Sequence, residues 1–298
     1  MMAFSILTGA LSMRQSLVMG LAGALLLGVP GALAAQDRPD RADRAERRDR
    51  MDRGDRQVQR DAFTLNERVP TGSWLRVRNL NGAIRTRAST SDRVEITATK
   101  SWRRGDPAAV RVETRKSGDG SILVCAYWSE NATCDETGYR TRNEGRNRNN
   151  NNDTALDFEI RLPRGVKLGV WTVNGGVSVD GATDEVAAGT VNGEIDATSS
   201  GGPVTGSTVN GNVHAVMGRL GGSEDLNFSS VNGTVVAEFV GDIDANIELS
   251  TVNGRFQTDW PVTITGRMDP RHLRATLGKG GRRIRLSTVN GNVELRKR

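Results

Sequence analysis

The sequence predicts an all-β protein that forms a single β-solenoid domain, with about 18–22 residues in each rung. Two observations support this class. A Thr-Val-Asn-Gly motif recurs along the second half of the chain, and nearly every copy leads into a segment where apolar and polar residues alternate. Alternation with a period of two marks strands with one buried face. Helical spacing is absent, and glycine is too frequent for helices.

The repeated motif sets the length of the predicted rungs. Its central asparagines are Asn174, Asn192, Asn210, Asn232, Asn253 and Asn290. They lie 18, 18, 22, 21 and 37 residues apart, and Asn79–Gly82 is an earlier relative of the motif. The last interval is about twice the others. It therefore holds either two coils, one of which has lost the motif, or one coil with an insertion.

The motif also predicts a corner at the same point of every rung. Asn-Gly is a strong turn signal because both residues tolerate positive φ. We expect the asparagines to stack as a structural ladder, with their amides bonding along it. We expect the threonines to face solvent and the preceding valines to point inward as an aliphatic column, namely Val173, Val191, Val209, Val231, Val252 and Val289. Threonine arrays or asparagine rows could instead bind a regular surface or a sugar, but only one threonine per rung is regular.

Expected strands follow the motifs at residues 176–179, 194–197, 212–215, 234–237 and 292–295. Residues 171–298 are expected to form the regular rungs. Residues 66–170 are less regular and are expected to cap or widen the solenoid.

The N-terminus indicates export. Residues 1–34 are typical of a signal peptide, with Arg14, an apolar run over 17–29 and a small-residue cleavage pattern at 32–34. An uncleaved anchor is the alternative. This is the only apolar run of that kind, so no transmembrane span is expected after signal cleavage. The protein is expected in the periplasm, on the cell surface or outside the cell.

Two segments have low-complexity composition. Residues 35–65 are expected to be a disordered mixed-charge linker, because nine arginines face eight acids over 36–61 and little is apolar. Residues 140–153 are rich in asparagine and arginine and are expected to form a long exposed loop.

Cys125 and Cys134 are expected to form a hairpin disulfide, since an oxidising compartment favours this pairing. Free thiols or a metal site are the alternatives. Two ligands without a nearby histidine are too few for zinc, so neither a metal nor a cofactor is expected.

Charge is distributed unevenly along the chain. Residues 172–254 carry 1 basic and 11 acidic groups, whereas residues 255–298 carry 11 basic and 3 acidic groups. The basic cluster could bind an anionic envelope polymer or a surface glycan, cap the solenoid, or bind acidic rungs of another copy. Nucleic acid is not expected for an exported chain without interleaved aromatics. The anion-binding candidates are Arg267, Arg271, Arg274, Lys279, Arg282 and Arg283.

A polysaccharide-acting β-helix enzyme is the main alternative. Asp242 with Asp244, and Glu194 with Asp196, have the spacing of carboxylates that share a strand face. Such pairs are common on solvent faces, and no nucleophile or phosphate-binding motif accompanies them. No catalytic residue is therefore assigned, and the chain is not expected to be an enzyme. The tryptophans that could be exposed and stack on sugars are Trp171 and Trp260; Trp74, Trp102 and Trp128 are expected to pack on N-terminal strands.

One combination of residues resembles a known family. Asp157–Leu168, with its Leu-Pro-Arg-Gly-Val turn, is followed by Trp171–Val177 and then by serial Thr-Val-Asn-Gly rungs. This pattern, over roughly residues 66–298, resembles the bacterial putative-adhesin family, a domain of unknown function in exported and envelope proteins. The resemblance implies a β-solenoid exposed at the envelope, with no established catalytic residues. We therefore expect a non-catalytic binding or scaffolding protein, or a structural protein that assembles end to end.

Overall fold

The structure is a computed structural model that describes residues 56–141, 152–220, 223–262, 269 and 271–298. The predicted signal peptide, residues 142–151 of the predicted loop, and Arg267 lie outside this part of the chain. No helix within the described ranges is long and apolar enough to cross a membrane.

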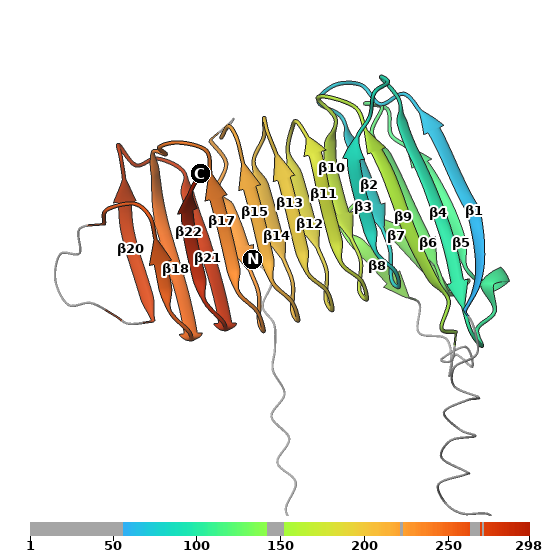
Figure 1. The fold of residues 1–298 in the computed structure, drawn as a ribbon. Helices are drawn as coiled ribbons and strands as arrows, with labels where there is room; N and C mark the ends of the chain where they lie inside the picture. The colour runs from blue at the N-terminus through green and yellow to red at the C-terminus, as the bar shows by residue number, and fades with distance from the viewer. Residues whose placement is uncertain (1–55, 142–151, 221–222, 263–268, 270) are drawn as a thin grey trace, which may run out of the picture. The chain divides into compact units, whose positions relative to one another are not determined.

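Two ten-stranded sheets, here called sheet A and sheet B, dominate the described residues (Figure 1). Sheet A runs in the spatial order β1 (Gln57–Glu67), β4 (Val94–Trp102), β9 (Ala155–Leu162), β3 (Ile84–Ala88), β11 (Val177–Ala182), β13 (Ile195–Ser199), β15 (Val213–Met217), β17 (Val235–Phe239), β22 (Val293–Lys297) and β19 (Phe256–Thr258). Sheet B runs in the spatial order β20 (His272–Leu277), β18 (Ala245–Asn253), β21 (Arg283–Asn290), β16 (Leu226–Ser229), β14 (Val204–Ser207), β12 (Val186–Gly189), β10 (Lys167–Trp171), β2 (Trp74–Arg78), β6 (Ile122–Tyr127) and β5 (Arg111–Lys116). The remaining elements are the hairpin β7 (Ala132–Asp135) with β8 (Gly138–Thr141), and the 3₁₀ helix η1 (Pro107–Ala109).

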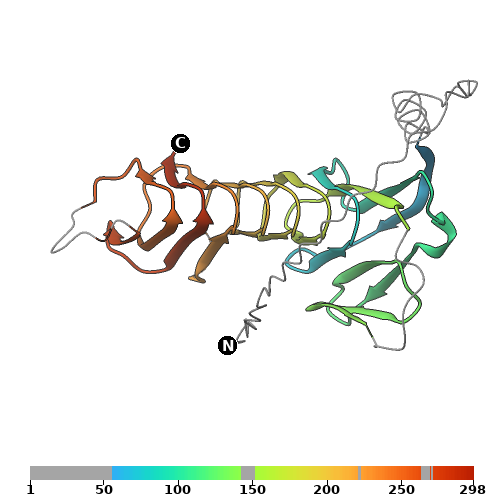
Figure 2. The same cartoon turned by 90° about the horizontal axis from the view of Figure 1, so that it is seen from below.

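The predicted β-solenoid is confirmed. From β10 to β17 each rung supplies one strand to sheet B and the next to sheet A, and successive rungs pair in parallel. Figure 2 shows these rungs as successive loops between the two sheets. Inward residues of adjacent rungs stack in two facing columns, and every member is at most 2% exposed. These columns are Leu168, Val186, Val204, Leu226 and Ile284 from sheet B, and Val177, Ile195, Val213, Val235 and Val293 from sheet A.

The prediction for the valines and threonines of the motif is wrong. Thr208 is only 5% exposed, whereas the neighbouring Val209 is 39% exposed, and the other rungs repeat this arrangement. The inward alternation of each sheet B strand continues to the threonine, because Val204, Gly206 and Thr208 all point inward. The buried hydroxyl of Thr208 donates a hydrogen bond to the carbonyl of Gly193 on the preceding rung, at 3.0 Å. The corner therefore buries a satisfied hydroxyl.

The asparagine ladder forms as predicted, with each side-chain amide nitrogen donating to the amide oxygen of the next asparagine in the stack. The N···O distances are 2.7–2.9 Å for Asn192 to Asn174, Asn210 to Asn192, Asn232 to Asn210, Asn290 to Asn232 and Asn253 to Asn290. Glycine is required next to this ladder because the rungs touch there. A Cβ on Gly211 would lie 1.9 Å from the carbonyl oxygen of Gly193.

The long interval before the last motif has a topological cause. Asn290 bridges to Asn232, and Asn253 pairs with Asn290, so the last rung in sequence lies between two earlier ones. Figure 1 shows β21 and β22 inside β18. The extra residues include β20, which pairs antiparallel with β18 on its outer side. One coil therefore carries an insertion, and the coils are out of sequence order.

The N-terminal part departs from the predicted linker. Strand β1 begins at Gln57, inside residues 35–65, and pairs antiparallel with β4. Phe63 and Leu65 of β1 pack against the core, which explains why these residues are ordered into a strand. Strand β5 pairs antiparallel with β6 at the edge of sheet B. Antiparallel strands thus end both sheets on this side of the rungs.

Candidate functional site on the outer face of sheet B

The outer face of sheet B is nearly flat along its central strands. Strands β12, β14 and β16 place residues with small or polar side chains on this face, so little rises above the backbone. We call this surface the sheet B shelf, and its residues are Ala187, Thr205, Ser207, Asn227 and Ser229.

Tryptophan and cationic side chains lie together at one end of the shelf. The guanidinium of Arg78 lies 3.8 Å from the ring centroid of Trp171, and that of Arg76 lies 4.6 Å from the ring of Trp74. The ammonium of Lys167 lies 5.6 Å from the same Trp74 ring. Parallel pairing of β2 with β10 produces this cluster, since it aligns Trp74 with Lys167 and Arg78 with Trp171. Cation–π contacts of this kind contribute about 0.5–2 kcal/mol each.

Two glycines determine where the Trp171 indole lies. A Cβ on Gly169 would meet the six-membered ring of the indole at 2.6 Å, and one on Gly189 would meet its pyrrole ring at 2.4 Å. The indole therefore extends across two strands at a position that only glycine permits. Both Trp74 and Trp171 are half-buried, so part of each ring remains at the surface.

Arg78 connects this cluster to the β7–β8 hairpin. It is 7% exposed, and burial lowers the pKa of its guanidinium. One terminal nitrogen donates to the carbonyl of Glu136, whereas Nε has no partner among the described residues. The carbonyl of Arg78 accepts a hydrogen bond from the hydroxyl of Tyr139 at 2.8 Å. A buried guanidinium with an unpartnered donor is costly, and its contact with the Trp171 ring offsets part of that cost.

The predicted disulfide joins Cys125 of β6 to Cys134 of β7, with a Cα–Cα distance of 6.3 Å. It holds the hairpin against the outer face of β6, beside the tryptophans. A second small core forms beneath it and contains Leu123, Cys125, Tyr127, Ala132, Cys134 and the partly buried Tyr139. Burial raises the pKa of the Tyr139 hydroxyl, which therefore stays protonated, and its single hydrogen lies within reach of the carbonyls of both Arg78 and Ala126. The hairpin is a wall at this end of the shelf.

The basic C-terminal residues do not form the single patch that the sequence suggests. The carbonyl of Arg271 bonds to Thr251 near the end of β18, whereas Lys279 and Arg282 lie near its start. Arg274 reaches Glu248 at 3.2 Å, and Arg283 reaches Asp225 at 3.9 Å. Acidic rungs thus pair with part of the cluster.

Glu248 shows the consequence of this pairing. Burial alone would raise the pKa of Glu248, but the hydrogen bond from Arg274 and the charges of Arg285 and Arg274 outweigh it and lower the pKa. The carboxylate therefore stays charged and holds both arginines on the outer face of sheet B.

The opposite face, on sheet A, is acidic. Its outward residues include Asp180, Asp196, Glu238 and Glu294. The imidazole of His214 lies 3.3 Å from a carboxylate oxygen of Asp196 and of Glu238, which belong to the two flanking strands. The two faces of the same rungs thus differ in charge, which the sequence order alone did not indicate.

The four carboxylates whose spacing suggested a catalytic pair each contact a different neighbouring group. Asp242 accepts from Lys297 Nζ at 2.6 Å, and this hydrogen bond lowers its pKa. Asp244 accepts from the backbone of Lys279, and Glu194 accepts from Asn212. Asp196 lies beside His214, as described above.

Trp260 does not occupy the surface position expected of a sugar-stacking residue. It is only 7% exposed and packs edge-on against Phe239. Of the two candidates, Trp171 is the one that reaches the surface, and it is joined there by Trp74, which was expected only to pack on an N-terminal strand. The outward position of Trp74 could have been predicted from the sequence, because Leu75 and Val77 point inward and the alternation then places Trp74 on the outer side of β2.

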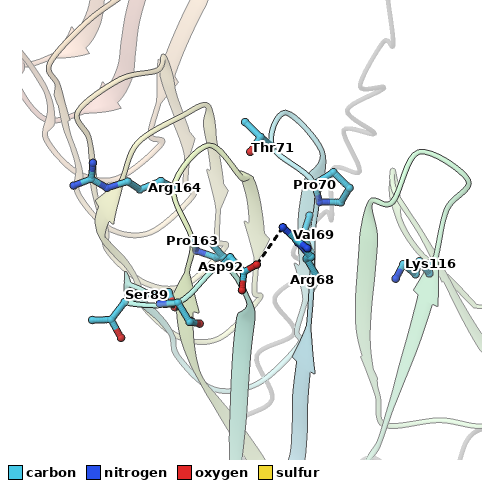
Figure 3. A pocket seen from close by; sticks show the side chains of 11 residues that line it. Arg68, Val69, Pro70, Thr71, Ser89, Asp92, Lys116, Pro163 and Arg164 are labelled. Atoms are coloured by element: carbon cyan, nitrogen blue, oxygen red, sulfur yellow. Dashed lines mark hydrogen bonds and ion pairs between the residues drawn. The ribbon is translucent and has the colours of Figure 1, made fainter.

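A hollow of about 770 Å³ lies near the N-terminal rungs and is lined by loops at 68–71, 89–92 and 163–164 together with Lys116. Figure 3 shows Arg68 and Asp92 pointing toward each other across it, with Arg164 and Lys116 on opposite sides. The Arg68–Asp92 pair spans 3.2 Å, and both side chains are mostly exposed. Exposed ion pairs contribute little, and these groups do not converge on one point.

No family model and no curated protein sequence matches the chain. Two solved structures are similar to it. A "putative cell adhesion protein" from Clostridium sporogenes shows 8% identity over 80% of this chain and 100% of its own, with a TM-score of 0.39. A "putative adhesin" from Bacteroides fragilis shows 10% identity over 82% and 99%, with a TM-score of 0.29. Similarity at this level says nothing about what this chain binds.

Proposed function

We propose that this is an exported, non-catalytic, adhesin-like protein of the cell envelope, which holds a glycan chain along the sheet B shelf. One observation carries the proposal: two half-buried tryptophans flanked by cations lie at the end of a flat, polar strip. Trp74 and Trp171 lie on adjacent strands and are offset by four residues, about 13 Å along the sheet. A chain of several sugar rings would span both.

The chemistry of the shelf fits a sugar. The C–H faces of sugar rings pack on indoles, and their hydroxyls bond to charged or amide groups. Arg76 is paired with Glu136 at 3.5 Å and Lys167 with Glu185 at 3.1 Å, so the cluster offers both donors and acceptors. Beyond the tryptophans, Thr205, Ser207 and Ser229 continue the row of hydroxyls. Arg283 and Arg285 at the far end would favour a glycan with anionic groups.

Export is supported by the disulfide and by the predicted signal peptide. A disulfide persists in an oxidising compartment, and the Cys125–Cys134 bond holds the wall of the proposed site. An envelope polymer would be the glycan that such a protein meets.

The non-catalytic part of the proposal is supported by the partners of the paired carboxylates. Glycoside cleavage needs two carboxyl groups that converge on one bond. Asp242 instead accepts a hydrogen bond from Lys297, and Glu194 accepts one from Asn212. Incubation with peptidoglycan should release no new reducing ends, and their appearance would contradict this part.

The test is co-sedimentation of the mature protein with peptidoglycan, lipopolysaccharide vesicles and neutral-lipid vesicles, each across a salt titration. We expect binding to a glycan-bearing sample and a loss of about tenfold in affinity for Trp74→Ala with Trp171→Ala. Trp102→Ala is the matched control, since Trp102 is a half-buried tryptophan on sheet A. Circular dichroism verifies that all variants fold. Absence of binding, or equal loss in the control, would overturn the proposal.

Salt separates the two kinds of glycan. Binding that weakens steeply with salt, and with Arg283→Ser and Arg285→Ser, indicates an anionic glycan. Binding that resists salt but needs the tryptophans indicates a neutral one.

A further inference from the structure

Two segments of the chain are almost interchangeable. Ile247–Gly254 reads Ile-Glu-Leu-Ser-Thr-Val-Asn-Gly, and Ile284–Gly291 reads Ile-Arg-Leu-Ser-Thr-Val-Asn-Gly. They differ only at Glu248 and Arg285. Both form the sheet B strand and corner of a rung, and they pair with each other in register. Either could complete the asparagine ladder beyond Asn232.

The C-terminal segment occupies the inner position. We call Arg282–Arg298 the C-terminal rung, and the space between the rungs 226–239 and 245–258 its slot. Its Thr288 hydroxyl donates to Gly233 at 2.8 Å, and Asn290 donates to Asn232 at 2.7 Å. On the other side, Gly291 accepts from Thr251 at 2.9 Å. The C-terminal rung is therefore hydrogen-bonded along both edges.

Charge favours the C-terminal segment over residues 245–258 in the slot. Arg285 is aligned with Glu248 on one side, and Arg283 reaches Asp225 on the other. Arg296 reaches Glu238 at 3.7 Å. These pairs attract the basic C-terminal rung to acidic neighbours. If the other segment filled the slot, Glu248 would stand in the place of Arg285 and would form none of these attractive pairs.

A single flexible connection leads into the slot. Residues 278–282 carry the chain from β20, outside β18, to β21 on its inner side. Gly278, Gly280 and Gly281 have φ of +56°, +73° and +127°, conformations that side chains rarely adopt. The contacts of the C-terminal rung would be the same if this connection led into the slot of another molecule.

We propose that the C-terminal rung exchanges between two copies of this chain, each copy filling the other's slot. The partner is a second copy, recognised by the same asparagine ladder, hydroxyl bonds and ion pairs. Exchange of an identical element needs no new interface and is governed by the connecting loop. This proposal is independent of glycan binding.

The test uses valines that the fold leaves exposed. Val231 and Val289 are 39% and 40% exposed and lie on adjacent rungs, since the amide of Asn290 donates to the carbonyl of Val231. Neighbouring strands are about 4.8 Å apart, within reach of a disulfide. One full-length chain carries Val231→Cys, and a second of different tag length carries Val289→Cys. The two are unfolded together without reductant, refolded at high concentration and oxidised.

Exchange predicts a cross-linked product that contains one chain of each length. The matched control mixes Val191→Cys with Val209→Cys chains, whose positions are 37% and 39% exposed on adjacent rungs outside the exchanged element. We expect the mixed product for 231 with 289 at several times the control level. Equal levels would overturn the proposal.

A second variant does not depend on cross-linking. Deletion of Gly280 and Gly281 leaves three residues to cross β18, which strains the route of the chain into its own slot and favours exchange. We expect this variant to be a folded dimer by light scattering. A monomer with the circular dichroism of the unaltered chain would overturn the proposal.

Discussion

The regular rungs and the N-terminal part both bury the core between sheets A and B, but their strands are stabilised in different ways. From β10 to β17 each rung contacts only its neighbours, in parallel, through corners of the same kind. From β1 to β9 the same two sheets are extended by antiparallel strands, a disulfide and a second small core. A repeat can stabilise its interior by repetition, but its end has no next rung and needs residues of its own.

The edge strands of the N-terminal part show how that end is protected. Strand β5 reads Arg-Val-Glu-Thr-Arg-Lys and is charged along its length. Strand β1 contains a register shift between Gln59 and Phe63, where Asp61 has φ of +52°. Charge and bulges on edge strands discourage pairing with other chains. The N-terminal edges are therefore poor sites for assembly, in contrast with the C-terminal rung.

The comparison predicts that substitution of a corner glycine causes the largest loss of stability. Gly211→Ala places a Cβ 1.9 Å from a backbone oxygen of the neighbouring rung, and neither rung can move without separating the ladder. We expect a loss of about 3 kcal/mol or more in the free energy of unfolding. Gly118→Ala in the N-terminal part is the control, because nothing lies within 4 Å of its Cβ position. Urea titration checks both, and similar midpoints would contradict the role of the corner.

The second effect is confined to the N-terminal part. Replacing Cys125 and Cys134 by alanine removes a cross-link over nine residues, which contributes about 2–3 kcal/mol. Because the hairpin contacts the outer face of sheet B, we expect faster amide exchange at β7 and β8. Exchange in β13 and β15 should not change, as measured by mass spectrometry. Uniform destabilisation would show that the two parts unfold as one unit.

The smallest expected change in stability distinguishes two neighbouring residues of one corner, Thr208 and Val209. Thr208→Val removes the buried hydroxyl that donates to Gly193, at a cost of about 1–2 kcal/mol. Val209→Thr changes an exposed side chain and should alter stability by less than about 0.5 kcal/mol. Thermal melts of the two variants test this order. The reverse order would mean that the valines form the inner column.

The sequence predicted the repeat unit well because its signals are local. Turn residues and the apolar alternation after each motif placed β11, β13, β15, β17 and β22 to within a few residues. The prediction of which motif residue points inward was wrong, because the alternation of apolar and polar residues before each motif was not extended into the motif. That alternation, through Leu168, Val170 and Thr172, was visible in the sequence.

The candidate site was less predictable. Trp171 was singled out by its residue type, but Arg78 was not, since the two are 93 positions apart and meet only through the pairing of β2 with β10. The basic cluster was visible as composition, yet its division among the acidic rungs depends on the order of the coils.

The sequence by itself determined the all-β class, the rung length, the asparagine corner and the cysteine pair, because each depends on neighbouring residues or on a fixed period. Only the tertiary structure decided which coil lies beside which. Two nearly identical segments compete for the position next to Asn232, and local pattern cannot separate them. Charge favours the observed order, because Asp225, Glu238 and Glu248 come together with arginines of the C-terminal rung only in the folded chain.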